Sequence, residues 1–198
     1  MKKPLWIWII SLALAAFWGP PLPAQAGTPT AYVRGILDQV MGLQNDPALS
    51  TQARSQAIHQ IIARNFDFAM MAKESLGPTY ERLSGGQRQE FTRTFSYLFQ
   101  DSYARLVLNF LKKENIQYSR ELPEGEKARV DTAIVRTNEN IPVTYLMHTA
   151  PQGWILYDVM VDGVSILQNY KTQFAQVIRT KSFEFLLNKM QEQRRAIQ

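Results

Sequence analysis

The sequence predicts an α+β fold, in which a helical layer packs on a curved, roughly four-stranded antiparallel sheet and encloses an apolar pocket. Apolar residues recur at helical spacing up to about residue 112. Short runs rich in β-branched and aromatic residues follow between residues 115 and 161. Helical spacing then returns from residue 166 onward. Helices, then strands joined by short loops, then helices again are typical of an α+β domain.

The first 26 residues have the pattern of a secretory signal peptide. Lys2-Lys3 precedes an apolar run, Leu5–Trp18, which is shorter than the roughly 20 residues that a membrane-spanning helix needs. Ala24-Gln25-Ala26 then supplies a small-residue cleavage pattern. We therefore expect cleavage after Ala26, export, and a single domain over residues 27–198, a length typical of one domain.

The chain contains no cysteine, which excludes disulfides, a cysteine nucleophile, thiolate metal sites and a bacterial lipoprotein anchor. An exported domain without disulfides depends on its apolar core, and 27–198 is long enough to bury one. The formal charge of +5 falls to +3 when Lys2 and Lys3 are removed with the leader. This small excess of positive charge does not indicate nucleic acid as a partner.

Several helices are expected before the strands. Thr28 and Pro29 are typical of an N-cap and a first helical position, and Asn45-Asp46-Pro47 ends that helix. A second helix covers Thr51–Asn65. A short third helix begins at Phe66 and ends near Leu76-Gly77-Pro78.

A long helix follows, with an aromatic stripe along one side. Ser84 and Gln87 form a capping box at its start, and helical spacing extends to about Lys112. The stripe consists of Phe91, Phe95, Leu98, Phe99, Tyr103, Leu106 and Phe110. Such a stripe is more often ordinary core than a ligand wall, but one this long requires a broad apolar surface opposite it.

Four strands with short connections predict an antiparallel meander. The expected strands are Asn115–Glu121, Ala128–Thr137, Ile141–Thr149 and Trp154–Val161, with turns at Leu122–Gly125, Asn138–Asn140 and Pro151–Gly153. On the third strand, the more apolar face is assigned inward. That face carries Ile141, Val143, Tyr145 and Met147. Both faces of the fourth strand are apolar, so its pattern does not decide which face lines the pocket.

The fourth strand leads directly into another helix through a tight turn at Asp162-Gly163. Ser165 is placed as the N-cap of this helix, whose apolar stripe runs through Ile166, Tyr170, Phe174, Val177 and Ile178. A last helix is expected over Ser182–Arg195. The strand, turn and helix together predict a rigid corner that closes the floor of the pocket.

Few residues suggest catalysis. His59 and His148 stand outside any recognisable motif, and no group of residues has the spacing of a metal site, so neither a metal nor another cofactor is expected. Asp158 and Asp162 flank an apolar strand, and a carboxylate in a dry cavity can become a base. The simpler interpretation is that Asp162 makes the turn, while Asp158 pairs with backbone groups or an arginine.

The segment around the corner carries a specific pattern: Trp154, Tyr157-Asp158-Val159, Asp162-Gly163-Val164-Ser165, Asn169-Tyr170 and Gln173-Phe174. This pattern resembles the signature of the MlaC, or toluene-tolerance, family of periplasmic phospholipid-binding proteins. Upstream, Phe66-Asp67-Phe68, Ala72, Leu76-Gly77, Leu83-Ser84, Gln87, Phe91, Phe95 and Tyr103 fit the helical part of the family. Tyr80 departs from it, since a tryptophan is expected there in many relatives, but one aromatic replaces another.

The resemblance implies a monomeric carrier in the periplasm that encloses acyl chains and leaves the head group in water. It also implies two docking partners, an inner-membrane ABC transporter with an MCE-domain subunit and an outer-membrane lipoprotein–porin complex. Transport between them would contribute to the lipid asymmetry of the outer membrane. A related branch of the family is associated with hopanoids, so the lipid class stays open.

We expect the lining of the pocket to come from the long helix and the third and fourth strands. The candidates are Phe95, Phe99, Tyr103, Val143, Tyr145, Met147, Trp154, Leu156 and Met160. Two alternatives remain. One is an enzyme that uses Asp158 or Asp162 as a base on an apolar substrate. The other is an adaptor whose apolar face is covered by a protein partner, which predicts a solid core without a cavity.

Overall fold

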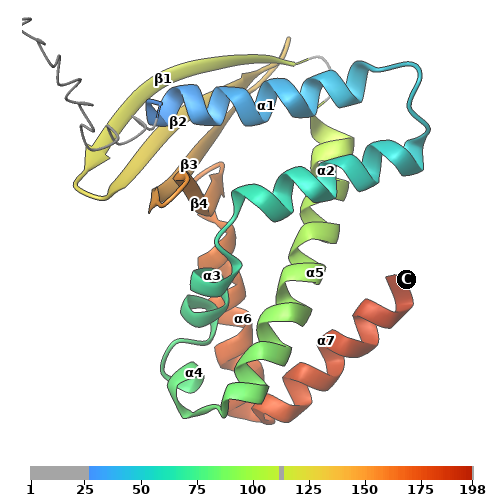
Figure 1. Ribbon diagram of the computed structural model, residues 1–198, viewed down its shortest axis with the longest axis vertical. Helices are drawn as coiled ribbons and strands as arrows, with labels where there is room; N and C mark the ends of the chain where they lie inside the picture. The colour runs from blue at the N-terminus through green and yellow to red at the C-terminus, as the bar shows by residue number, and fades with distance from the viewer. Residues whose placement is uncertain (1–26, 112–113, 198) are drawn as a thin grey trace, which may run out of the picture.

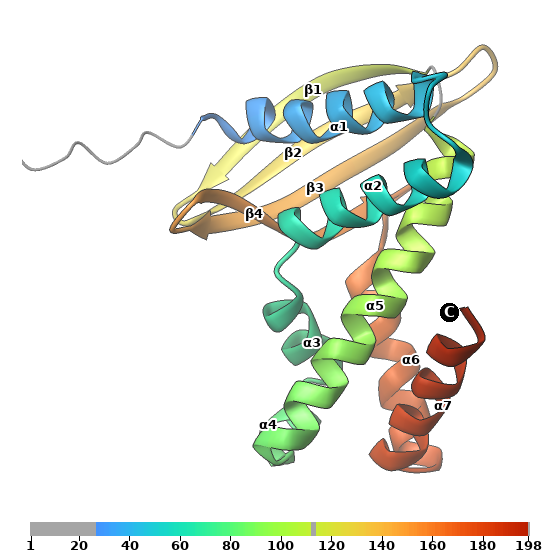
Figure 2. The same ribbon diagram turned by 45° about the vertical axis from the view of Figure 1, so that its right-hand side comes forward.

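The computed structural model describes residues 27–111 and 114–197, and its architecture is the expected α+β arrangement (Figure 1). A five-stranded antiparallel sheet, in the order β1-β2-β3-β4-β5, lies at one end of the molecule. The helices cover one face of this sheet and extend away from it (Figure 2). The signal peptide expected over residues 1–26 lies outside the described residues and stays a prediction.

Two helices lie next to the sheet, as Figure 2 shows. α1 spans Pro29–Asn45 and packs on β1 and β2, and α2 spans Thr51–Asn65 and packs on α1 and α5. Thr28 caps α1 by accepting a hydrogen bond from the Ala31 amide at 3.2 Å. Both helices have the predicted bounds.

The next segment differs from the prediction. α3 spans Phe68–Leu76 and therefore begins two residues later than expected. The Asp67 amide donates to the Leu156 carbonyl at 2.8 Å, and the Asp67 carboxylate caps α3 through the Met70 amide at 2.9 Å. Phe66 and Asp67 thus join the helical part to the sheet. A further short helix, α4 at Pro78–Arg82, was not predicted.

The longest helix, α5, spans Gly85–Phe110 and connects the far end of the molecule to the sheet. Its start has the predicted capping box between Ser84 and Gln87, but it ends at Phe110 rather than near Lys112. α6 spans Ile166–Thr180, and α7 spans Phe183–Ile197. Within the described residues, none of the helices is both long enough and apolar enough to cross a bilayer.

The strands are β1 (Asn115–Glu124), β2 (Lys127–Val135), β3 (Asn140–Ala150), β4 (Gly153–Val161) and β5 (Val164–Ser165). The expected turn at Leu122–Gly125 was wrong, because β1 continues to Glu124 and turns at Gly125, whose φ is +63°. Pro123 is tolerated there because β1 is an edge strand. On β3, Val143, Tyr145 and Met147 are buried as predicted.

A fifth strand of two residues adds to the roughly four-stranded sheet that was predicted. Asp162 and Gly163 both have positive φ, +49° and +76°, as a two-residue hairpin turn requires. This turn folds Val164 and Ser165 back onto Val161 and Met160, so the corner is a short hairpin before α6 begins. Ser165 is the N-cap of α6, as predicted.

Candidate functional site

The second half of α5 faces the sheet across an almost purely apolar cavity of about 130 Å³, here called the sheet cavity. Its walls are Tyr103, Leu106, Val107, Leu111, Ile134, Ile141, Val143, Tyr145 and Val161. Two further cavities adjoin it, of about 150 Å³ toward α6 and about 30 Å³ toward α1 and α2. The Tyr103 side chain lines all three, so its ring stands at the junction of these spaces.

Two tyrosine hydroxyls enter this dry region. Burial raises the pKa of Tyr103, and the nearby negative charge of Asp158 raises it further. Burial also raises the pKa of Tyr145 well above its ordinary value. Thr132, buried beside them, donates its hydroxyl to the Val143 carbonyl at 2.9 Å. The region therefore presents neutral phenol groups and hydrocarbon. Such a surface suits an uncharged apolar ligand better than a reaction that depends on a charged side chain.

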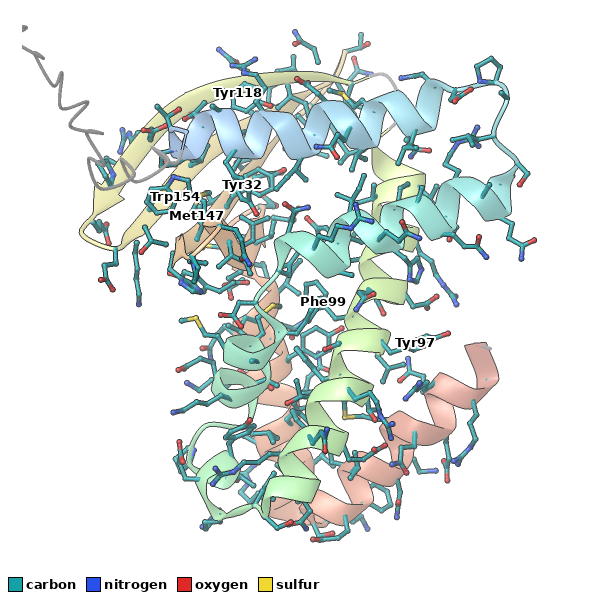
Figure 3. The ribbon with its side chains drawn as sticks, viewed as in Figure 1. Tyr32, Tyr97, Phe99, Tyr118, Met147 and Trp154 are labelled. Atoms are coloured by element: carbon teal, nitrogen blue, oxygen red, sulfur yellow. The ribbon has the colours of Figure 1, made fainter. Side chains whose placement is uncertain are left out.

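The first half of α5 carries rings that are packed against one another. This ring cluster consists of Phe66, Phe68, Phe91, Phe95, Phe99, Tyr170 and Phe174. Phe95 and Tyr170 have centroids 5.3 Å apart at an interplanar angle of 80°, an edge-to-face contact of the favourable kind. Figure 3 shows Phe99 leaving α5 on the side opposite Tyr97, toward α3 and α6. Most of the predicted aromatic stripe therefore builds core.

The structure answers the question of which face of the fourth strand points inward. Leu156 pairs with Met147, whereas Asp158 pairs with the preceding residue of β3, Leu146, so Tyr157 is the extra residue of a β-bulge. The bulge reverses the alternation. Leu156 points inward before it, and Val159 points inward after it.

This bulge explains why one predicted lining residue lies outside the sheet cavity. Met160 lies one residue past Val159, pairs with Thr144 and Ser165, and is not among the residues that line the cavities around Tyr103, so its part in the lining stays a prediction. Trp154 lies near the other end of β4, where its indole Nε1 donates to the Gly27 carbonyl at 2.9 Å. It does not reach the cavities around Tyr103.

The other predicted residues divide among the cavities. Tyr103, Val143 and Tyr145 line the sheet cavity, Leu156 lines the cavity toward α1 and α2, and Phe99 lines the cavity toward α6. Phe95 lines a separate space among α5, α6 and α7. Met147 is fully buried on the inward face of β3 but lies outside these spaces.

Sequence reasoning missed several aliphatic walls. Val107, Leu111, Ile134 and Val161 contribute much of the sheet cavity. A signal for Ile134 was present, because Ala128, Val130 and Ile134 recur on one face of the second strand. Leu106 belongs to the long stripe, and its side chain is 38% exposed at the edge of the cavity.

The carboxylate of Asp158 organises the corner. It is 5% exposed and accepts hydrogen bonds from the Val159 amide at 2.8 Å and the Leu167 amide at 3.0 Å. Its other oxygen accepts the Ser165 hydroxyl, which in turn accepts the Gln168 amide at 2.9 Å. Asp158 and Ser165 therefore hold the first turn of α6 against β4, in agreement with the simpler interpretation of Asp158.

The two histidines lie outside the cavities around Tyr103. His148 Nε2 lies 3.0 Å from the Asp67 carboxylate, and this pair connects β3 to the start of α3. His59 lies on α2 with a partly exposed side chain. Among the described residues, no three His, Asp or Glu side chains converge in a geometry that could hold a metal ion.

Comparison with known proteins gives consistent matches. Residues 34–192 match the MlaC protein family. The binding protein MlaC of the intermembrane phospholipid transport system of Haemophilus influenzae is 23% identical over 206 residues, covering 97% of this chain and 93% of that protein. The toluene tolerance protein ttg2D of Pseudomonas putida is 23% identical over 172 residues, covering 84% of this chain and 79% of that protein.

The fold is likewise similar to a solved structure. The phospholipid-binding protein of Ralstonia solanacearum, determined in complex with a phospholipid, aligns with a TM-score of 0.75 and 23% sequence identity. The alignment covers 85% of this chain and 98% of that one. Because the family match spans most of the described residues and the fold agrees, this chain belongs to the MlaC family.

Proposed function

We propose that this chain is a periplasmic phospholipid carrier, exported by a leader over residues 1–26 and acting as a monomer. It takes acyl chains into the apolar space between α5 and the sheet and leaves the head group in water. The main observation behind this proposal is the sheet cavity, whose walls are almost entirely hydrocarbon. Two similar proteins support phospholipid as the cargo: the binding protein of an intermembrane phospholipid transport system, and the Ralstonia solanacearum protein whose structure contains a phospholipid.

The acyl chains of the cargo pass between two environments that both exclude water, the membrane and the pocket of the carrier. Burying about 30 methylene groups from water at about 0.8 kcal/mol each would exceed the ceiling of roughly 18–21 kcal/mol for non-covalent affinity. Acyl chains in a bilayer are already out of water, so carrier and membrane compete nearly evenly. A docked partner that favours opening of the pocket is then sufficient for transfer.

We place the carrier between an inner-membrane ABC transporter with an MCE-domain subunit and an outer-membrane lipoprotein–porin complex. Exchange between them contributes to the lipid asymmetry of the outer membrane.

Entry of an acyl chain requires the walls to move. Ligand pockets generally measure about 300–1,000 Å³, and two acyl chains would need the upper part of this range. The cavities beside Tyr103 are smaller, at about 130, 150 and 30 Å³. Since Tyr103 separates them, displacement of its ring is the simplest way to join them into one space.

The alternatives are less well supported. The adaptor hypothesis predicts a solid core, whereas one cavity lies between α5 and the sheet and another between α5 and α6. An enzyme with Asp158 as its base would have to break the hydrogen bonds that hold the start of α6. Asp162 lies in an exposed turn, away from the sheet cavity. A hopanoid would occupy the same apolar space, and the mass of the bound lipid distinguishes the two cargoes.

The test is mass spectrometry of the purified protein under native conditions, followed by uptake of labelled phospholipid from vesicles. We expect bound phospholipid, and an uptake reduced at least tenfold in Ile141→Trp, which fills the sheet cavity. Val164→Trp is the matched control, because Val164 is 60% exposed on β5 and lies outside the cavity. A protein that carries no lipid and takes up none from vesicles would contradict the proposal.

A further inference from the structure

A second space lies on the other side of the ring cluster, among α5, α6 and α7. This three-helix groove has a volume of about 430 Å³. Its walls are Phe95, Leu98, Ser102, Ile166, Asn169, Tyr170, Gln173, Phe174, Val177, Leu186, Lys189, Met190 and Gln193. Figure 1 shows why a wedge forms here: α7 leaves the far end of α6 and rises at an angle to α5.

The floor of the groove is apolar and well buried. Phe95, Leu98, Phe174, Leu186 and Met190 are each less than 7% exposed. Unlike the sheet cavity, the groove already falls within the range of about 300–1,000 Å³ that is usual for ligand pockets. Its size lies in the lower part of that range, which suits one acyl chain and not two.

The rim of the groove is polar and carries positive charge. Ser102, Asn169, Gln173, Lys189 and Gln193 are exposed along it, and no carboxylate is among the residues that line it. Lys189 Nζ lies 2.7 Å from Glu192, but both side chains are more than half exposed, so their attraction is weak. An acidic ligand group can therefore compete for the Lys189 ammonium.

The groove is separate from the space that we assign to phospholipid. Ser102, Ile166 and Tyr170 line both the groove and the 150 Å³ cavity near Tyr103, and they form the wall between them. The sheet cavity shares no lining residue with the groove.

We propose that the three-helix groove is a second binding site, which takes a single-chain amphiphile with an acidic head. The acyl chain lies on the floor formed by Phe95 and Phe174, and the acidic group binds Lys189 at the rim. A fatty acid and an anionic lysophospholipid share this chemistry. The site goes beyond phospholipid transport, because it neither requires nor excludes occupation of the sheet cavity.

The experiment measures binding of oleate, of oleoyl-lysophosphatidylglycerol and of oleyl alcohol to the delipidated mature chain, each below its aggregation concentration. We expect the two acidic ligands to bind about tenfold more tightly than the alcohol, a difference of about 1.4 kcal/mol. Lys189→Glu should remove this preference while leaving alcohol binding unchanged. If only one of the two acidic ligands binds, the result shows whether the groove takes a fatty acid or an anionic lysophospholipid.

The location of the binding site is tested by substitutions that fill the groove with a large side chain. Val177→Trp should abolish binding of the acidic ligands but keep phospholipid uptake, whereas Ile141→Trp should do the reverse. Ala175→Trp is the matched control, since Ala175 is exposed on α6 and lies outside the groove. Should Val177→Trp fold poorly, the head-group preference in Lys189→Glu decides the question alone.

Two results would overturn the proposal. One is the absence of binding by either acidic ligand to the unaltered chain. The other is binding that survives Val177→Trp and disappears in Ile141→Trp, which would assign the single-chain ligands to the sheet cavity. Neither result depends on whether phospholipid uptake itself is observed.

Discussion

The two halves of α5 use the same apolar stripe for different purposes. Phe91, Phe95 and Phe99 pack into the ring cluster, where the first two are 0% and 1% exposed and rings touch rings at 5.3 to 6.2 Å. Beyond Tyr103, the aliphatic side chains of Leu106, Val107 and Leu111 face the sheet across the sheet cavity. Within the cluster, the rings fill the space among α5, α3 and α6, whereas the aliphatic side chains leave a cavity beside the sheet. The ring cluster therefore supports the sheet cavity, and the aliphatic residues line that cavity together with Tyr103 and Tyr145.

The sharpest test of this comparison is Phe95→Ala in the ring cluster. Removing a fully buried phenyl group generally costs about 3–5 kcal/mol of unfolding free energy, because transfer and cavity terms add. Phe95 contacts Phe91, Phe99, Tyr170 and Phe174, so we expect the upper part of that range. Urea denaturation measures it. A loss below about 1 kcal/mol would mean that the cluster is loosely packed and resembles the cavity.

The second test concerns the corner that joins the two regions. Ser165→Ala removes the N-cap of α6 and one donor to the buried Asp158, so we expect a loss of about 1–3 kcal/mol. Because α5 runs through both regions, unfolding should stay a single transition when followed by tryptophan fluorescence and by circular dichroism. Two separate transitions would show that the regions fold independently. Thr172→Ala, on the exposed side of α6, is the control.

The third test measures how alkaline pH changes the stability of the region between the helices and the sheet. Burial raises the pKa of Tyr32 from 10.0 to about 12, and it also raises the pKa values of Tyr103 and Tyr145. The unfolded chain therefore loses these protons first, so the stability that the three tyrosines contribute is fully present below about pH 10 and falls as the pH rises from 10 toward 12. Denaturation at a series of pH values measures the slope. Tyr32→Phe should flatten it, and an unchanged slope would contradict this assignment.

The smallest effect is expected for Leu106→Ala at the edge of the sheet cavity. Leu106 is 38% exposed, and surface substitutions usually change stability by no more than about 0.5 kcal/mol. Thermal denaturation should barely move, while lipid uptake should still change because a wall of the cavity is lost. Destabilisation as large as that of Phe95→Ala would abolish the distinction between the two halves of α5.

Much of the fold could be predicted from periodicity and capping. α1 and α2 begin after Thr28 and Ser50, which supply their N-terminal hydrogen bonds, and the Ser84–Gln87 box begins α5. The start of α3 was mispredicted because the Asp67 amide donates to the Leu156 carbonyl, far away in the sequence. Local pattern contains no information about such a distant partner. The hairpin that forms β5 was missed because two residues are too few to show alternation.

The candidate site was predicted less completely, for a physical reason. Periodicity places Tyr103, Val143 and Tyr145 on inward faces, and all three line the sheet cavity. Whether an inward residue meets a void or another side chain depends on how closely two elements approach, and apolar pattern does not encode that distance. Phe95 and Val143 are both buried at regular spacing, yet only Val143 borders the sheet cavity.

The bulge at Tyr157 has a consequence for how this protein can diversify. It divides one strand into two stretches with different neighbours. Before the bulge, Leu156 forms a bridge with Phe66 at the junction with the helices. After it, Val159 and Val161 pair with Tyr145 and Val143 of β3. A relative could therefore change Val161, which lines the sheet cavity, without altering the bridge between Phe66 and Leu156 before the bulge. A single extra residue in the strand thus lets one wall of the sheet cavity vary independently of the junction with the helices.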